Sequence, residues 1–119
     1  MMPVRMPAKR AHKYGAKRVV LPGGEVFRSQ REYARWCQLN VMLQTGQIAG
    51  LCREVVFELA PAVRVQGRKR PPLRYVADFV YSTADGRTVV EDAKGVRTEG
   101  YRIKRHLMAA VHGVEISEV

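Results

Sequence analysis

Two aspartates and a lysine in the second half of the chain are of the types that can hydrolyse a phosphate ester. Asp78 lies in a segment of alternating polarity, thirteen residues separate it from Asp92, and Lys94 follows two positions later. Two carboxylates are typical ligands of Mg²⁺, and an ammonium stabilises negative charge that builds up on a phosphodiester. This chemistry requires the fold to bring the three side chains together.

A tight turn between the two aspartates predicts that they meet. If Ala84-Asp85-Gly86 is a three-residue hairpin loop with its glycine in the left-handed conformation, the strand register places Asp78 opposite Asp92. Lys94 shares a face with Asp92, because side chains alternate along a strand. A two-residue loop centred on Asp85-Gly86 would shift this register by one residue.

Facing carboxylates are costly in a purely structural protein. At a separation of about 5 Å and an effective dielectric constant of about 20, their repulsion is on the order of 3 kcal/mol. A divalent cation would remove this repulsion. The structural alternative is that Asp78 pairs with Arg74 or Arg87 and that Lys94 is solvated.

Length and composition restrict the class of protein. The chain has 119 residues, of which 46% are hydrophobic and 27% charged, so it is expected to form one globular domain. No apolar run is long enough for a membrane span, and no apolar stretch follows the basic N-terminus as in a secretory signal. Cys37 and Cys52 lack a disulfide or metal-binding spacing, which predicts free thiols in a reducing cytoplasm.

Positive charge is concentrated in two segments. The chain has 21 Lys and Arg against 11 Asp and Glu, a formal net charge of +10. Residues 1–18 contain six cations and no acid. A second cluster flanks Pro71-Pro72 and consists of Arg64, Arg68, Lys69, Arg70 and Arg74. Such clusters favour a nucleic acid, because each cation that meets a phosphate releases counterions, although a solvated basic surface is the simpler alternative.

The remaining pattern predicts a mixed α/β domain over 19–119, preceded by a flexible basic arm at 1–18. Small-residue turns and apolar alternation predict a hairpin at 19–27 and strands at 54–59, 73–81, 88–94 and 114–119. A Ser29-x-x-Glu32 capping box opens a helix from about 30 to 45, with Trp36 in the core. Thr98 caps a second helix that ends at Gly113, and its predicted buried face is Ile103, Leu107, Ala110 and Val111.

The chemistry-bearing residues match a known signature. Asp78 followed by Asp92-Ala93-Lys94 resembles the Asp…(Asp/Glu)-x-Lys pattern of the PD-(D/E)XK, or restriction-endonuclease-like, nucleases. The wider string is similar to a small phage and prophage family of that superfamily, labelled as a domain of unknown function. The matching pieces are Lys13-Tyr14-Gly15, Phe27-x-Ser29-x-x-Glu32, Tyr75-x-x-Asp78-Phe79, Glu91-Asp92-x-Lys94-Gly95 and Tyr101-x-x-Lys104. Two departures from the superfamily pattern are Ala77 where proline is common and Asp92 where glutamate is common.

The resemblance implies a core of helix, three strands, helix and strand, and it assigns roles to four residues. Asp78, Asp92 and Glu32 would bind Mg²⁺, for which Mn²⁺ can substitute, and Lys94 would be the catalytic lysine. The backbone carbonyl of Ala93 is a common additional ligand in such sites. Glu32 is also the acid of the capping box, which is its structural alternative. Glu91 is expected on the opposite face, unless the register slips by one and Glu91 replaces Asp92.

Contacts to DNA are expected from the basic cluster and from the second helix. The candidate residues are Arg68, Lys69, Arg70, Arg74, Lys104 and Arg105, for which solvated side chains are the alternative. The three histidines are too scattered to form a metal site with the cysteines, and Tyr101 is expected in the core.

The sequence therefore predicts a Mg²⁺-dependent DNA endonuclease, acting on duplex DNA or on branched DNA such as a Holliday junction. By analogy with small relatives, we expect a phage- or prophage-encoded homodimer in the cytoplasm of a bacterial host. One alternative is a catalytically inactive DNA-binding protein on a nuclease-like scaffold. A second alternative, an RNA-directed or ribosome-associated protein, is less favoured, because aromatic residues are only 8% of the chain.

Overall fold

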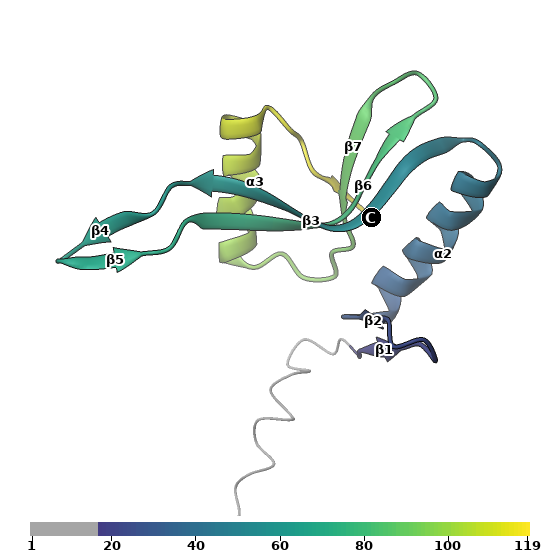
Figure 1. Ribbon diagram of the computed structural model, residues 1–119, viewed down its shortest axis with the longest axis horizontal. Coiled ribbons are helices and arrows are strands. Elements are labelled where there is room, and N and C mark those ends of the chain that lie inside the picture. Colours follow the sequence, from purple (N-terminus) through teal and green to yellow (C-terminus); the bar gives the residue numbers. More distant parts are fainter. Residues whose placement is uncertain (1–16) are drawn as a thin grey trace, which may run out of the picture.

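The computed structural model describes residues 17–119, so nearly all of the predicted arm at 1–18 lies outside the described residues. The described chain forms two helices and eight strands (Figure 1). Their order is β1 (Val19–Val20), β2 (Val26–Phe27), α2 (Gln30–Gln44), β3 (Ile48–Ala60), β4 (Val63–Val65), β5 (Arg68–Arg70), β6 (Leu73–Thr83), β7 (Thr88–Asp92), α3 (Glu99–His112) and β8 (Ser117–Glu118).

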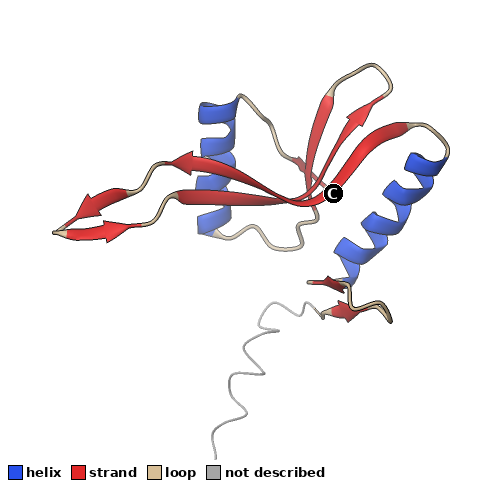
Figure 2. Cartoon of the chain, in the orientation of Figure 1, coloured by secondary structure: helices blue, strands red, loops and turns tan. Residues whose placement is uncertain are grey.

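The central sheet has four strands in the order β3-β6-β7-β8. β6 is antiparallel to both β3 and β7, whereas β8 runs parallel to β7. The parallel step is possible because α3 lies between β7 and β8 in the chain and returns it to the same end of the sheet. The predicted mixed α/β class, with a mixed sheet, is confirmed (Figure 2).

Both helices begin and end where local sequence chemistry requires. Ser29 Oγ accepts a hydrogen bond from the backbone N–H of Glu32 at 3.1 Å, and Thr98 Oγ1 accepts one from Tyr101 N–H at 3.2 Å. These bonds satisfy backbone donors that have no partner in the first helical turn. α3 ends at Gly113 with φ of 65°, a left-handed conformation that glycine adopts at little cost.

β3 is more than twice as long as predicted. It begins at Ile48 rather than at residue 54, because Gly50, which looks like a strand terminator, has φ of 66° within a register shift between Ala49 and Cys52. Such a shift is a β-bulge, which bends a strand without ending it. β7 ends at Asp92, two residues earlier than predicted.

The segment between the strands predicted at 54–59 and 73–81 contains a two-stranded ribbon, which was not predicted. β4 and β5 pair antiparallel from Val63↔Arg70 to Val65↔Arg68, and they continue the β3–β6 hairpin away from the rest of the molecule (Figure 1). Gln66 and Gly67 form the tip with φ of 52° and 77°, the signs of a type I′ hairpin turn. The valine–arginine alternation before this glycine was the missed signal.

Two apolar clusters form the core. Leu39 on α2 packs with Phe79 on β6, and the ring of Trp36 stacks on Phe79 with centroids 6.0 Å apart. The second cluster joins α3 to the other part of the sheet through Tyr101 and Met108. Between the two clusters lies the segment of β6 that contains Asp78.

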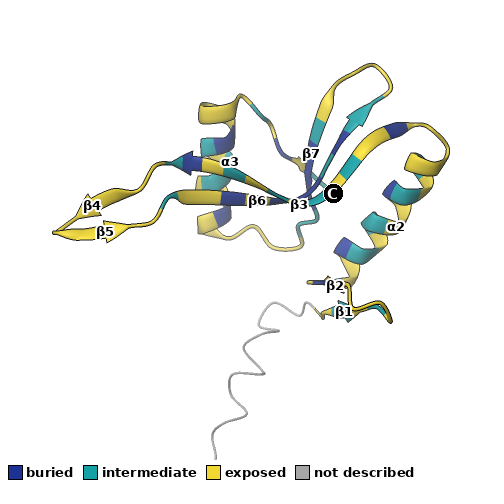
Figure 3. Cartoon of the chain, viewed as in Figure 1, coloured by how far each residue is buried: buried dark blue, intermediate teal, exposed yellow. Residues whose placement is uncertain are grey.

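The predicted buried face of α3 is correct only in part, and most residues of this helix are exposed (Figure 3). Ile103 and Val111 are each 52% exposed, whereas Leu107 packs against the core. Tyr101 is buried, as expected, and its hydroxyl donates a 2.6 Å hydrogen bond to Glu118.

Cys37 and Cys52 are both exposed and free of disulfides, as predicted. Neither helix of the described chain is long and apolar enough to span a bilayer.

Candidate functional site

The β6–β7 hairpin has the predicted register. Thr83 N–H donates to the carbonyl of Arg87 at 2.8 Å, and Gly86 has φ of 87°, so the loop has three residues. The ladder pairs Phe79 with Glu91. Continuing it by one position brings Asp78 opposite the last residue of β7, Asp92.

Asp78 is buried and accepts one hydrogen bond on each carboxylate oxygen. Arg28 donates to Oδ1 and the backbone N–H of Ala93 donates to Oδ2, both at 2.8 Å. Burial, followed by the negative charge of Asp92, raises the pKa of Asp78 to about 7. The alternative pairing of Asp78 with Arg74 or Arg87 is wrong, because Arg28 takes that role.

Asp92 is also buried and lies between a phenol and an ammonium. Tyr75 OH donates to Oδ2 at 2.6 Å, and Lys94 Nζ is 3.1 Å from Oδ1. The same Nζ lies 4.2 Å from the centre of the Tyr101 ring, at cation–π distance. Lys94 is therefore held at the site rather than solvated, and Tyr101 is buried as predicted.

Glu32 has the capping role considered for it, and one of its oxygens is left over from that role. As part of the helix cap, its Oε1 accepts a hydrogen bond from the backbone N–H of Arg28 at 2.8 Å. Its Oε2 is buried without a hydrogen-bond partner, and the nearest cation is the guanidinium of Arg53 at 3.8 Å. An unpartnered buried carboxylate oxygen is costly, so capping alone does not explain this side chain.

Glu91 lies on the opposite face of β7, as the register requires. Arg35 donates to both of its oxygens, at 2.9 and 2.7 Å, and Tyr81 OH donates to Oε2. The proposed slip that would exchange Glu91 for Asp92 does not occur. Arg35 and Tyr81 were not anticipated as its partners.

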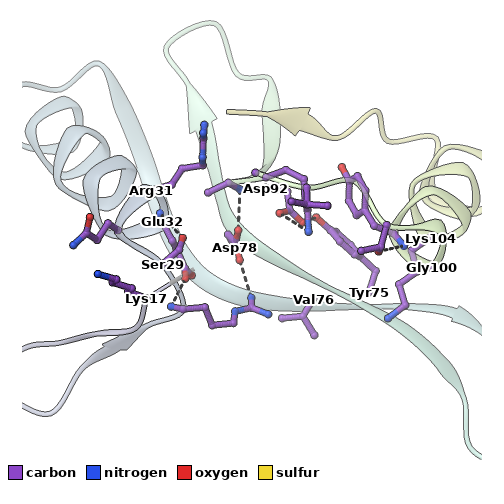
Figure 4. A pocket seen from close by; sticks show the side chains of 18 residues that line it. Lys17, Ser29, Arg31, Glu32, Tyr75, Val76, Asp78, Asp92, Gly100 and Lys104 are labelled. Carbon is purple, nitrogen blue, oxygen red and sulfur yellow. Dashed lines mark hydrogen bonds and ion pairs between the residues drawn. The ribbon is translucent and has the colours of Figure 1, made fainter. Parts of the chain in front are cut away.

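The four predicted catalytic residues, Glu32, Asp78, Asp92 and Lys94, line one cavity of about 960 Å³ between the starts of α2 and α3 (Figure 4). Lys104 lines it as well. Three further cations of the lining were missed as site residues, namely Lys17, Arg28 and Arg31. The position of Arg28 next to the capping box was an available signal, because a helix start that carries a site acid also brings its neighbours to the site.

The other predicted DNA contacts lie outside this cavity. Arg105 bonds to Glu118 at 2.8 Å and helps attach β8 to α3. The hydrogen bond from Tyr101, with those from Arg97 and Arg105, lowers the pKa of Glu118 to about 2. Arg68, Lys69 and Arg70 are on β5, and Arg74 is at the start of β6.

The donor set of the cavity fits a hard divalent cation. Within residues 17–119, no three His, Cys, Asp or Glu side chains are close enough to enclose a metal ion by themselves. Mg²⁺ does not need such a cage, because it binds through one or two carboxylates and retains several waters. Oε2 of Glu32 has no hydrogen-bond partner, and burial with the negative charge of Asp92 raises the pKa of Asp78. A cation bound here would give Glu32 a partner and would favour the ionised form of Asp78.

Comparison with known families gives one match. The model of a family described as "Protein of unknown function (DUF1064)" matches residues 11–116, which is most of the chain. No curated protein and no solved structure matches.

Proposed function

The chain belongs to the DUF1064 family, and we propose that it is a divalent-metal-dependent DNA endonuclease with a PD-(D/E)XK-like core. The observation that supports this most strongly is the convergence of Asp78, Asp92, Glu32 and Lys94, from three parts of the chain, on one cavity. The order α2, β3, β6, β7, α3, β8 is also the order expected of such a core.

The acids of the cavity have separate tasks in this proposal. Asp78 and Asp92 would hold a Mg²⁺ ion, and the unpartnered oxygen of Glu32 would bind one of the waters that the ion retains. The bound cation would supply a Lewis acid for the phosphodiester and lower the pKa of an attacking water. Its charge would also favour the ionised form of Asp78, whose pKa is raised to about 7 in its absence.

The cations of the cavity would bind and orient the substrate. Lys94 is held by Asp92 and by the Tyr101 ring, so its ammonium keeps a fixed position beside the acids. There it can stabilise charge that develops on the phosphate oxygens. Lys17, Arg31 and Lys104 line the same cavity and provide contacts for neighbouring phosphates.

Cleavage assays test this proposal. Supercoiled plasmid, linear duplex and a synthetic four-way junction are each incubated with Mg²⁺ or with EDTA. The variants are Asp78→Asn, Asp92→Asn and, as a matched control, Asp85→Asn at the exposed hairpin turn. We expect cutting only with Mg²⁺, loss of cutting in the first two variants, and normal cutting in the control.

The outcome on the three substrates also separates general nicking from junction resolution. If none of them is cut by a folded protein, as judged by circular dichroism, the endonuclease proposal is wrong for these DNAs.

A second candidate is a catalytically inactive DNA-binding protein on the same scaffold. It is favoured by the contacts of Asp78 and Asp92, whose four carboxylate oxygens all have protein partners without a metal. Salt-sensitive DNA binding that is unaffected by EDTA, together with no cleavage, would support this candidate.

A further inference from the structure

The ribbon formed by β4 and β5 is exposed along its whole length, and its charged side chains are all positive. From residue 59 to 77 there are five cations and no acid: Arg64, Arg68, Lys69, Arg70 and Arg74. None of the five forms an ion pair with any described residue. Their charge is therefore available to a polyanionic partner.

Both faces of the ribbon carry positive charge. Paired residues of an antiparallel ladder share a face and successive pairs alternate, so Arg64 and Lys69 lie on one face. Arg68 and Arg70 lie on the other, with Val63 and Val65, which are 50% and 46% exposed. A ribbon that lay flat on an anionic surface would need cations on one face only. Cations on both faces suit insertion between two rows of phosphates.

The dimensions of the ribbon match a DNA groove. The major groove of B-form DNA is about 12 Å wide and about 8.5 Å deep, and it admits a two-stranded ribbon. Strands of three residues at about 3.3 Å per residue extend about 10 Å, close to that depth. The major groove of double-stranded RNA is too deep and narrow for side chains to read. The exposed valines can contact thymine methyl groups.

The ribbon and the cavity are connected by one strand. Asp78 and Val76 of β6 line the cavity (Figure 4). Arg74 is two positions before Val76 in the same strand, on the side of the ribbon. The eight residue-to-residue steps from Asp78 to Arg70 span about 26 Å at about 3.3 Å per step. At about 3.4 Å per base pair, this corresponds to about eight base pairs.

We propose that the β4–β5 ribbon inserts into the major groove of duplex DNA up to about eight base pairs from the phosphate held at the cavity. The substrate would then need a duplex arm on the ribbon side of the cut, whether the cut lies in linear or in branched DNA. Binding of DNA by the ribbon does not depend on nuclease activity, whereas the position of the cut rests on the proposed function.

Binding measured in EDTA tests the ribbon without cleavage. Fluorescence anisotropy compares a DNA duplex of about twenty base pairs with a single strand and an RNA duplex of equal length, over a range of salt concentrations. The variant R68Q/R70Q removes two ribbon cations, and R87Q/R102Q removes two exposed cations elsewhere as a charge-matched control. A second variant, V63S/V65S, tests the apolar contacts.

For R68Q/R70Q we expect duplex DNA to bind about tenfold more weakly, with the slope of log affinity against log salt reduced by about 2. R87Q/R102Q should leave that slope unchanged. V63S/V65S should weaken duplex binding severalfold without changing the slope, because it removes no charge. RNA duplex binding should change little in either ribbon variant.

Equal losses on all three nucleic acids would overturn groove insertion, and unchanged duplex binding in R68Q/R70Q would overturn any role of the ribbon. The failures of the two proposals are distinguishable. If the ribbon variants weaken duplex binding but the wild type cuts no DNA, only the nuclease proposal is wrong. If the wild type cuts DNA but the ribbon variants bind duplex normally, only the ribbon proposal is wrong.

Discussion

One buried carboxylate and a group of three lie on opposite faces of β7, and Glu91 and Asp92, one from each face, are adjacent in sequence. Glu91 is 1% exposed, and its two oxygens accept hydrogen bonds from Arg35 and Tyr81, so its charge is fully compensated by the protein. On the other face, Asp92 lies with Asp78 and Glu32, and one oxygen of Glu32 has no hydrogen-bond partner. Complete compensation suits a structural contact, whereas incomplete compensation suits the binding of a cation.

The largest expected effect separates the two faces by activity. Asp78→Asn should lower the rate of Mg²⁺-dependent plasmid cleavage by about 10³-fold, equivalent to about 4 kcal/mol, because the uncharged amide is a poor ligand for the cation. Initial rates at saturating Mg²⁺ measure this loss. Asp85→Asn, on the exposed turn, should cleave at the wild-type rate, and a comparable loss there would show that the assay does not report on the cavity.

A change to Glu91, in contrast, should lower the stability of the fold and leave cleavage unaffected. Glu91→Gln should lower the free energy of unfolding by about 3 kcal/mol, because the guanidinium of Arg35 is left without its counter-charge. Urea unfolding in EDTA measures the change, and the variant's cleavage rate per folded molecule should remain close to that of the wild type. Wild-type stability in this variant would contradict the structural role assigned to Glu91.

The pH dependence of stability should arise mainly from Asp78. Its pKa is raised from 3.8 to about 7 in the folded chain, so between these values the folded protein binds a proton that the unfolded chain has lost. Stability in EDTA should therefore fall as the pH rises, by roughly 2 kcal/mol between pH 5 and 7.

The matched comparison for this pH effect is Asp78→Asn. Denaturation at each pH should give a flatter profile for the variant than for the wild type. Identical profiles would contradict the assignment of the raised pKa to Asp78.

The smallest expected effect comes from the helix caps. Ser29→Ala and Thr98→Ala should each lower the free energy of unfolding by about 1 kcal/mol, because each removes an acceptor for a first-turn N–H. Only Ser29→Ala should also raise the Mg²⁺ concentration needed for half-maximal cleavage, since it loosens the turn that orients Glu32. If both variants needed the same Mg²⁺ concentration, Glu32 would have no part in the proposed metal binding.

The features of the site geometry that the structure confirms are those that local sequence determines. The glycine at position 86 sets the hairpin loop, and the loop sets which residues face each other across β6 and β7. The capping box likewise fixes the start of α2 and the position of Glu32 within its first turn. Both depend on neighbours within a few residues, for which sequence signals are strong.

The parts that were missed depend on contacts between distant segments. Arg28 reaches Asp78 across fifty positions, and the Tyr75 hydroxyl reaches Asp92 although its ring belongs to the core. The hydrogen bond from the buried Tyr101 to Glu118 was likewise not predicted. Periodicity alone does not identify such partners, because tertiary packing selects among several amphipathic faces.

The bulge at Gly50 has a consequence for how copies of the chain can associate. β3 is an edge strand of thirteen residues, and in the described sheet it pairs only with β6. A flat edge of this length would be a template for adding a strand from another molecule. Positive φ angles at Gly50 and Glu54 interrupt it, and the edge also carries charged side chains. These features oppose the addition of a strand from a second molecule at this part of the edge.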